Sequence, residues 1–78
     1  MTPGKFDLIF VGFLNEYTKS GTTRFDLKQG ETIRDIVAAK NVSEQTVGFV
    51  TANSDIVSLD YQVKDGDTIK VFPLIIGG

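Results

Sequence analysis

The feature that most constrains the fold is the segment Phe6–Phe13, which is apolar on both faces of a predicted strand. Its β-branched and aromatic residues favour a strand. Alternation divides the apolar side chains into two sets, Phe6, Leu8 and Phe10 on one face and Ile9, Val11 and Phe13 on the other. A strand that is apolar on both faces is usually central and covered. We therefore expect this segment to lie in the interior of a sheet.

Four further strands are predicted from short apolar runs that lie between turn residues. They are Thr23–Leu27, Val47–Thr51, Ile56–Val57 and Thr68–Phe72. Polar residues predict a turn at 15–22, which makes the first two strands a hairpin, and a tight turn at 53–55. Pro73 lacks an amide hydrogen, so it should end regular pairing or confine it to a sheet edge.

One helix is predicted between the second and third strands. Its apolar stripe has the spacing i, i+3, i+4 and consists of Ile33, Ile36 and Val37. Thr32, followed three residues later by Asp35, resembles a capping box and marks the start of the helix. We expect the helix to end near residue 40, with Asn41 as its C-cap. Residues 43–45 can form a further turn.

This order of elements predicts an α+β fold. One helix can cover only one face of one sheet, which gives two layers. A hairpin, a helix and a further strand that pairs beside the first is the order of a β-grasp. We expect a four- to five-stranded mixed sheet packed on one main helix. The predicted domain spans residues 1–73, and an extended tail follows at residues 74–78.

Composition excludes several classes of function. The 78 residues include no cysteine and no histidine, which rules out disulfides, thiolate zinc sites, iron–sulfur ligation and Cys or Ser–His catalysis. The net charge of −2 argues against nucleic acid as the main partner. No apolar run approaches the roughly 20 residues of a membrane span, and no signal peptide is visible. We therefore expect no membrane partner and a cytoplasmic location. Asp65-Gly66-Asp67 is interpreted as a turn rather than a metal site.

The last five residues, Leu74-Ile75-Ile76-Gly77-Gly78, are an unusual chemical feature. Such an apolar segment is usually held by its own domain or by a partner, and an extended form suits threading into a cleft. Glycine has no Cβ, so the two glycines can pass a narrow channel. The terminal carboxylate is ionised at neutral pH and is a poor electrophile. Acyl transfer therefore requires its activation, for example as a mixed anhydride with AMP. The alternative is a flexible end or a cloning remnant.

Three blocks of the sequence resemble the MoaD/ThiS family of ubiquitin-like sulfur carriers, and together they cover most of the chain. The first block is Gly12–Glu16, and the second is Leu27–Ile36, which leads into the helix. The third and most specific is Val63–Pro73, followed at the right separation by Gly77-Gly78. The resemblance implies a ubiquitin-like β-grasp. It leaves the branch open, because the hairpin resembles molybdopterin synthase small subunits and residues 41–50 resemble the thiamine carriers.

The resemblance also implies a sulfur carrier that is not itself an enzyme and binds no cofactor. A ubiquitin-activating-type adenylyltransferase would adenylate Gly78 with ATP, and a sulfur donor would convert the acyl-adenylate to a thiocarboxylate. The sulfur would then pass to a molybdopterin synthase large subunit, for the molybdenum or tungsten cofactor, or to thiazole synthase, for thiamine. The activating partner would recognise the tail through Leu74, Ile75, Ile76 and Gly77.

Phe72 and Pro73 are predicted docking residues for the partner. Phe72 falls on the opposite strand face from Ile69 and Val71, so it either points outward beside the tail or makes a second-face core contact. Two other functions stay open. One is a ubiquitin-like protein modifier that is conjugated through Gly78 to lysines, and the other is an interaction module whose tail packs on its own sheet.

Overall fold

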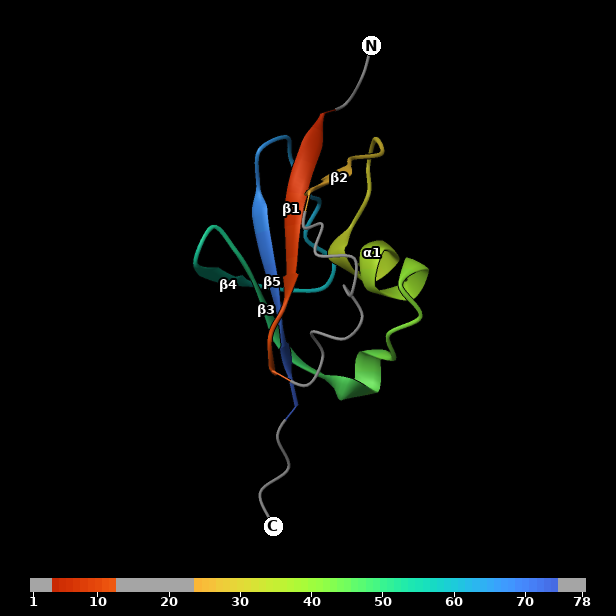
Figure 1. Cartoon of the computed structure of the whole chain (residues 1–78), viewed down its shortest axis with the longest axis vertical. Helices are drawn as coiled ribbons and strands as arrows, with labels where there is room; N and C mark the ends of the chain where they lie inside the picture. Colours follow the sequence, from red (N-terminus) through yellow and green to blue (C-terminus); the bar gives the residue numbers. More distant parts are fainter. Residues whose placement is uncertain (1–3, 13–23, 75–78) are drawn as a thin grey trace.

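The computed structural model describes residues 4–12 and 24–74, which form five strands, one α-helix and one 3-10 helix (Figure 1). In chain order they are β1 (Lys5–Phe10), β2 (Arg24–Asp26), α1 (Ile33–Ala39), η2 (Glu44–Thr46), β3 (Val47–Ala52), β4 (Asp55–Val57) and β5 (Thr68–Pro73). The turn predicted at residues 15–22 and the tail beyond Leu74 lie outside the described residues.

The five strands form one mixed sheet in the order β2-β1-β5-β3-β4. β1 and β5 pair in parallel, whereas the β1–β2, β3–β5 and β3–β4 pairs are antiparallel. α1 lies across one face of the sheet (Figure 1). The predicted α+β β-grasp, with a mixed sheet on one main helix, is therefore confirmed. β1 lies in the interior of the sheet, as predicted.

The hydrophobic core lies between the sheet and α1. Its fully buried side chains come from the strands and the helix and include Leu8, Ile33, Val37, Val50, Ile69 and Val71. On β1 the buried set is the one predicted for one face, Phe6, Leu8 and Phe10. The other face of β1 was expected to be covered as well, and this expectation is wrong. Ile9 and Val11 are only half-buried, because α1 packs on the opposite face.

The capping box at the start of α1 is confirmed. The Thr32 hydroxyl oxygen accepts a hydrogen bond from the Asp35 amide at 3.2 Å, and the Asp35 carboxylate accepts one from the Thr32 amide at 3.1 Å. The bond from the Thr32 backbone lowers the pKa of Asp35. The C-cap is Lys40 and not Asn41. Asn41 follows the cap with a φ of 62°, a left-handed conformation that asparagine tolerates well at this position.

A buried carboxylate ties together two turns that are distant in sequence. Asp67 accepts hydrogen bonds from the Asn53 side chain at 2.8 Å, the Tyr61 hydroxyl at 2.8 Å and the Lys64 amide at 2.9 Å. Asn53 and Ser54 form the predicted turn between β3 and β4, with φ values of 53° and 77°. Both residues are left-handed, as in a two-residue type I′ hairpin turn. Asp67 therefore has a structural role in the Asp65-Gly66-Asp67 turn.

Candidate functional site

The first part of the C-terminal tail lies against β3. We call Pro73 and Leu74 the tail root. Pro73 is the last residue of β5 and pairs with Val47. The Leu74 amide then donates one more hydrogen bond, at 2.8 Å, to the Thr46 carbonyl oxygen. Regular pairing thus ends at Pro73, as its missing donor predicts. The backbone of Leu74 is fixed by this bond, while its side chain remains 45% exposed.

Gly48 allows the tail root to pass directly against β3. The β3–β5 register shifts between Val47 and Phe49, so Gly48 is the extra residue of a β-bulge. A Cβ on Gly48 would lie 2.7 Å from the Pro73 carbonyl oxygen and 3.1 Å from the Leu74 Cα. Gly48 was not among the site residues predicted from the sequence. The available signal was a glycine inside a predicted strand, which often marks a bulge or a close approach of another backbone.

Phe72 stacks on Phe49 beside the tail root. The two ring centroids are 4.3 Å apart and the ring planes differ by 8°. Phe72 is half-buried and lies outside the hydrophobic core, and Phe49 is 44% exposed. Of the two placements considered for Phe72, the structure has the outward one. Phe49 was missed as a site residue, because its contact with Phe72 depends on the pairing of β3 with β5.

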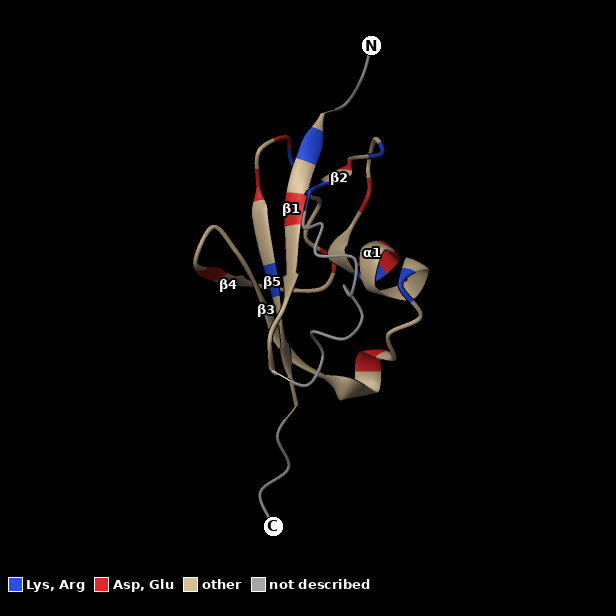
Figure 2. Cartoon of the chain, in the orientation of Figure 1, with Lys and Arg blue, Asp and Glu red and all other residues tan. Residues whose placement is uncertain are grey.

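An apolar patch surrounds this aromatic pair on the sheet face opposite α1. Strand alternation and register place Phe49, Ile56, Phe72 and Leu74 on that face, and we call these four residues the open-face patch. Ile56 is the most exposed of them, at 74%. The parts of β3 and β5 nearest the tail carry no charged residue (Figure 2). Exposed apolar residues gathered in this way are typical of a protein-binding surface.

The predicted site residues are thus only partly described. Phe72, Pro73 and Leu74 lie together at the end of β5, where β3 adjoins them. Ile75, Ile76, Gly77 and Gly78 lie outside the described residues, and their roles stay predictions. Within residues 4–12 and 24–74, no group of three or more acidic side chains is placed to hold a metal ion. The same part of the chain contains no helix with the length and apolar character needed to cross a bilayer.

A mixed five-stranded sheet on one helix, in the strand order β2-β1-β5-β3-β4, defines the chain as a ubiquitin-like β-grasp protein. The family model described as Mut7-C ubiquitin matches residues 8–76. The chain belongs to this ubiquitin-like family, and the resemblance noted from its sequence is confirmed at that level. No curated protein sequence matches the chain.

Solved structures of small archaeal proteins share the fold. Molybdopterin converting factor subunit 1 from Pyrococcus furiosus has a TM-score of 0.72 at 21% identity, over 92% of this chain and 99% of that one. SAMP1 from Haloferax volcanii has a TM-score of 0.69 at 24% identity, over 96% and 100%. A second structure, of H. volcanii small archaeal modifier protein 1, has a TM-score of 0.69 at 19% identity, over 92% and 99%. At these identities the similarity establishes the fold.

Proposed function

We propose that the chain is a sulfur carrier whose Gly78 carboxylate is adenylated and converted to a thiocarboxylate. The observation that carries this proposal is the tail root. The backbone of Leu74 is held by its hydrogen bond to Thr46, and its exposed side chain belongs to the open-face patch. Four residues, 75–78, follow this fixed point in the sequence, and the last two of them are glycines. A partner that grips the patch would therefore receive the tail in a defined direction.

The proposed chemistry is carried out by partners. A carboxylate oxygen of Gly78 attacks the α-phosphorus of ATP held by an adenylyltransferase, and pyrophosphate leaves. The sulfur of a donor then attacks the acyl carbon and displaces AMP, which leaves the acyl group on sulfur. Cleavage of the bond between that sulfur and its donor completes the thiocarboxylate, with electrons supplied by a thiol reductant where the donor is a persulfide. Apart from the Gly78 carboxylate, the proposed steps require no acid, base or nucleophile from the chain, whose sequence has no cysteine and no histidine.

The acceptor of the sulfur is proposed from the resemblance. A molybdopterin synthase large subunit or a thiazole synthase would take the sulfur from Gly78, in the cytoplasm. The structural similarity to molybdopterin converting factor subunit 1 supports the first acceptor, although it establishes only a shared fold. The proposal makes the chain a carrier or the small subunit of a synthase complex, and not an enzyme by itself.

Intact mass measures the proposed modification directly. We expect the chain to gain the oxygen-to-sulfur mass difference after incubation with its adenylyltransferase, ATP and a sulfur donor. A chain that lacks Gly77 and Gly78 should keep its mass. Only two residues then follow Leu74, and this segment is too short to reach the adenylation centre. Absence of the mass gain with every adenylyltransferase of the host would contradict the proposal. Unchanged biological activity of the shortened chain would contradict any function that depends on the two terminal glycines.

A protein modifier is the second candidate. It is favoured by the structural similarity to small archaeal modifier protein 1. Adenylation of Gly78 would be the same, but a lysine amine would take the acyl group and form an isopeptide bond. Because the last Lys or Arg of the chain is Lys70, trypsin-digested cellular proteins would then carry Val71–Gly78 remnants on lysine that depend on this chain. If these remnants were found and no thiocarboxylate was detected, the modifier function would replace the carrier function.

The open-face patch is proposed as the docking surface for the adenylyltransferase. Phe72→Ala and Phe49→Ala should each raise the KM for the chain about tenfold and leave kcat within about twofold, because aromatic side chains often dominate an interface. Both rings lie away from the reacting carboxylate. Phe25→Ala is the matched control, since Phe25 lies on the sheet face that α1 covers. An equal rise in KM for Phe25→Ala would contradict a docking role specific to the patch.

A further inference from the structure

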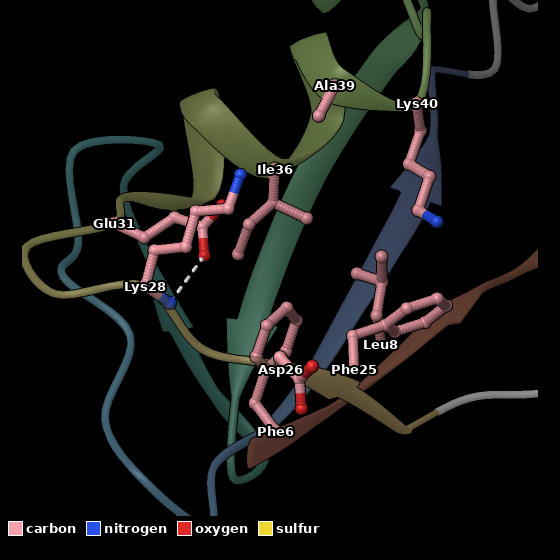
Figure 3. A pocket seen from close by; sticks show the side chains of 9 residues that line it. All are labelled: Phe6, Leu8, Phe25, Asp26, Lys28, Glu31, Ile36, Ala39 and Lys40. Atoms are coloured by element: carbon pink, nitrogen blue, oxygen red, sulfur yellow. Dashed lines mark hydrogen bonds between the residues drawn. The ribbon is translucent and has the colours of Figure 1, made fainter. Parts of the chain in front are cut away.

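A groove lies between the edge strand β2 and α1, on the sheet face opposite the open-face patch. It has a volume of about 190 Å³. Its apolar lining consists of the half-buried Phe25 and the buried core residues Phe6, Leu8 and Ile36, which lie around the hollow in Figure 3. For scale, a cavity of about 150 Å³ can hold benzene. The groove can therefore take one or two branched aliphatic side chains, and it includes no residue of the tail root.

The outer backbone edge of the strand that borders the groove is unpaired among the described residues. β2 is the outermost of the five strands, and within residues 4–12 and 24–74 it pairs with β1 alone. The Leu27 amide bonds the Gly4 carbonyl oxygen at 2.9 Å, so by alternation the backbone groups of Phe25 also point toward β1. Those of Arg24 and Asp26 then point outward. Within the described residues no backbone group pairs with them, and such an edge can accept another extended segment.

Charge at the groove favours an acidic partner. Of the two acidic groups at its rim, Asp26 is paired with the Lys5 ammonium at 2.5 Å, whereas Glu31 only accepts a hydrogen bond from the uncharged Lys28 amide at 3.2 Å. In the described part of the chain, Lys28 and Lys40 have no ion-pair partner, so two ammonium groups face the one uncompensated carboxylate of Glu31. Figure 3 shows their side chains on opposite sides of the groove. The Lys40 ammonium lies 4.0 Å from the centre of the Phe25 ring, so it sits directly beside the apolar surface.

We propose that this groove binds an extended segment of a partner protein that combines aliphatic and acidic residues. The segment adds as a strand to the outer edge of β2 and places an aliphatic side chain against Phe25 and Ile36. Acidic residues on either side of that side chain pair with Lys28 and Lys40. This binding is independent of the tail chemistry, because the groove and the tail root lie on different faces of the sheet and share no residue.

The probe is a fluorescein-labelled octapeptide with the sequence Asp-Asp-Val-Ile-Val-Ile-Asp-Glu, titrated with the full chain. We expect saturable binding, with amide chemical-shift changes concentrated in β2 and the last turn of α1. A peptide with lysine at each acidic position should bind at least tenfold more weakly, because it meets Lys28 and Lys40 with like charge. A peptide with serine at each aliphatic position should lose most of the binding. Shift changes at Phe49 and Phe72 instead of β2 would overturn the proposal.

Two adjacent alanines provide a matched pair of variants. Ala38 and Ala39 are both exposed in the last turn of α1, but only Ala39 lines the groove. Ala39→Glu should weaken binding of the acidic peptide at least tenfold, whereas Ala38→Glu should change it less than twofold. Lys28→Glu gives a second test that leaves the helix unaltered, with about fivefold weaker binding expected. Equal affinity of the two alanine variants, or no binding by the unaltered chain, would refute the site.

Discussion

Replacing Asp67 with alanine is expected to lower the free energy of unfolding by about 3 kcal/mol. Asp67 is 6% exposed, and its carboxylate accepts three hydrogen bonds, from Asn53, Tyr61 and the Lys64 amide. The variant leaves these donors without their acceptor in a buried site. Asn53 cannot turn its amide group to compensate, because its carbonyl oxygen accepts the Thr68 amide at 3.0 Å. A domain of this size has a total stability of about 4–12 kcal/mol, so urea unfolding should show the loss clearly.

Asp55→Ala is the control for this loss. Asp55 pairs with Ala52 through the backbone of the edge strand β4, but its exposed side chain makes none of the side-chain hydrogen bonds or ion pairs found among the described residues. Its replacement should change the free energy of unfolding by less than about 0.5 kcal/mol. The loss in the free energy of unfolding for Asp67→Asn should lie between those for Asp55→Ala and Asp67→Ala, because one amide oxygen can keep part of the network. Similar losses for Asp55→Ala and Asp67→Ala would show that the buried network contributes little.

The same carboxylate should make the domain sensitive to acid. Burial raises the pKa of Asp67, but the hydrogen bonds from Lys64, Asn53 and Tyr61 outweigh burial and hold the pKa below its ordinary value of 3.8. Between the lowered pKa of Asp67 in the folded state and its ordinary pKa in the unfolded state, the unfolded chain binds more protons than the folded chain. The free energy of unfolding therefore falls as the pH falls through this range. Its contribution is complete above about pH 5. Asp67→Asn should flatten this part of the profile, leaving the contributions of Asp26 and Asp35, whose pKa values are also lowered.

Gly48→Ala is expected to release the tail root from β3 while the domain stays folded. The new Cβ would meet backbone atoms of Pro73 and Leu74, which cannot rotate away as a side chain can. Displacing them should break the bond from the Leu74 amide to Thr46. Hydrogen exchange at that amide should then accelerate by about tenfold or more. If the carrier proposal holds, kcat for adenylation should fall by a similar factor, because the tail enters the partner without a fixed direction.

Gly30→Ala separates this effect from a general cost of replacing glycine. Gly30 has a φ of 76°, so alanine is strained there by about 1 kcal/mol, but no atom of residues 4–12 or 24–74 crowds the new Cβ within 4 Å. The Leu74 amide should exchange as slowly in this variant as in the unaltered chain. Slow exchange at Leu74 in Gly48→Ala would show that the tail root tolerates the extra atom.

Local signals in the sequence predicted most of the fold. The alternation in Phe6–Phe13 identified an interior strand, and the pair Thr32 and Asp35 identified the start of α1. These features depend on residues close together in the chain. The wrong assignment of Asn41 as the C-cap of α1 has the same origin. Lys40 and Asn41 are adjacent, and only the backbone geometry shows that Lys40 is the cap and Asn41 the residue after it.

The site was less accessible to sequence reasoning because it is assembled from distant segments. The partner of Phe72 could not be named until β3 was placed in register with β5. The role of Gly48 required the same register together with its bulge. The buried network around Asp67 joins three segments, and nothing near Asp67 in the sequence identifies Asn53 as its partner. Phe72, by contrast, was found because it is adjacent to the tail.

The parallel pairing of β1 with β5 also determines how the domain responds to mechanical force. Because β1 and β5 run in the same direction, the beginning of β1 and the end of β5 lie at opposite ends of the sheet (Figure 1). A pull applied through Lys5 and Leu74 therefore shears the two strands along their length. The evenly spaced hydrogen bonds from Asp7–Thr68 to Phe10–Val71 are then loaded together and not one after another. A partner that draws on the tail would meet its greatest resistance at the centre of the sheet, so the tail can be pulled taut while the domain remains intact.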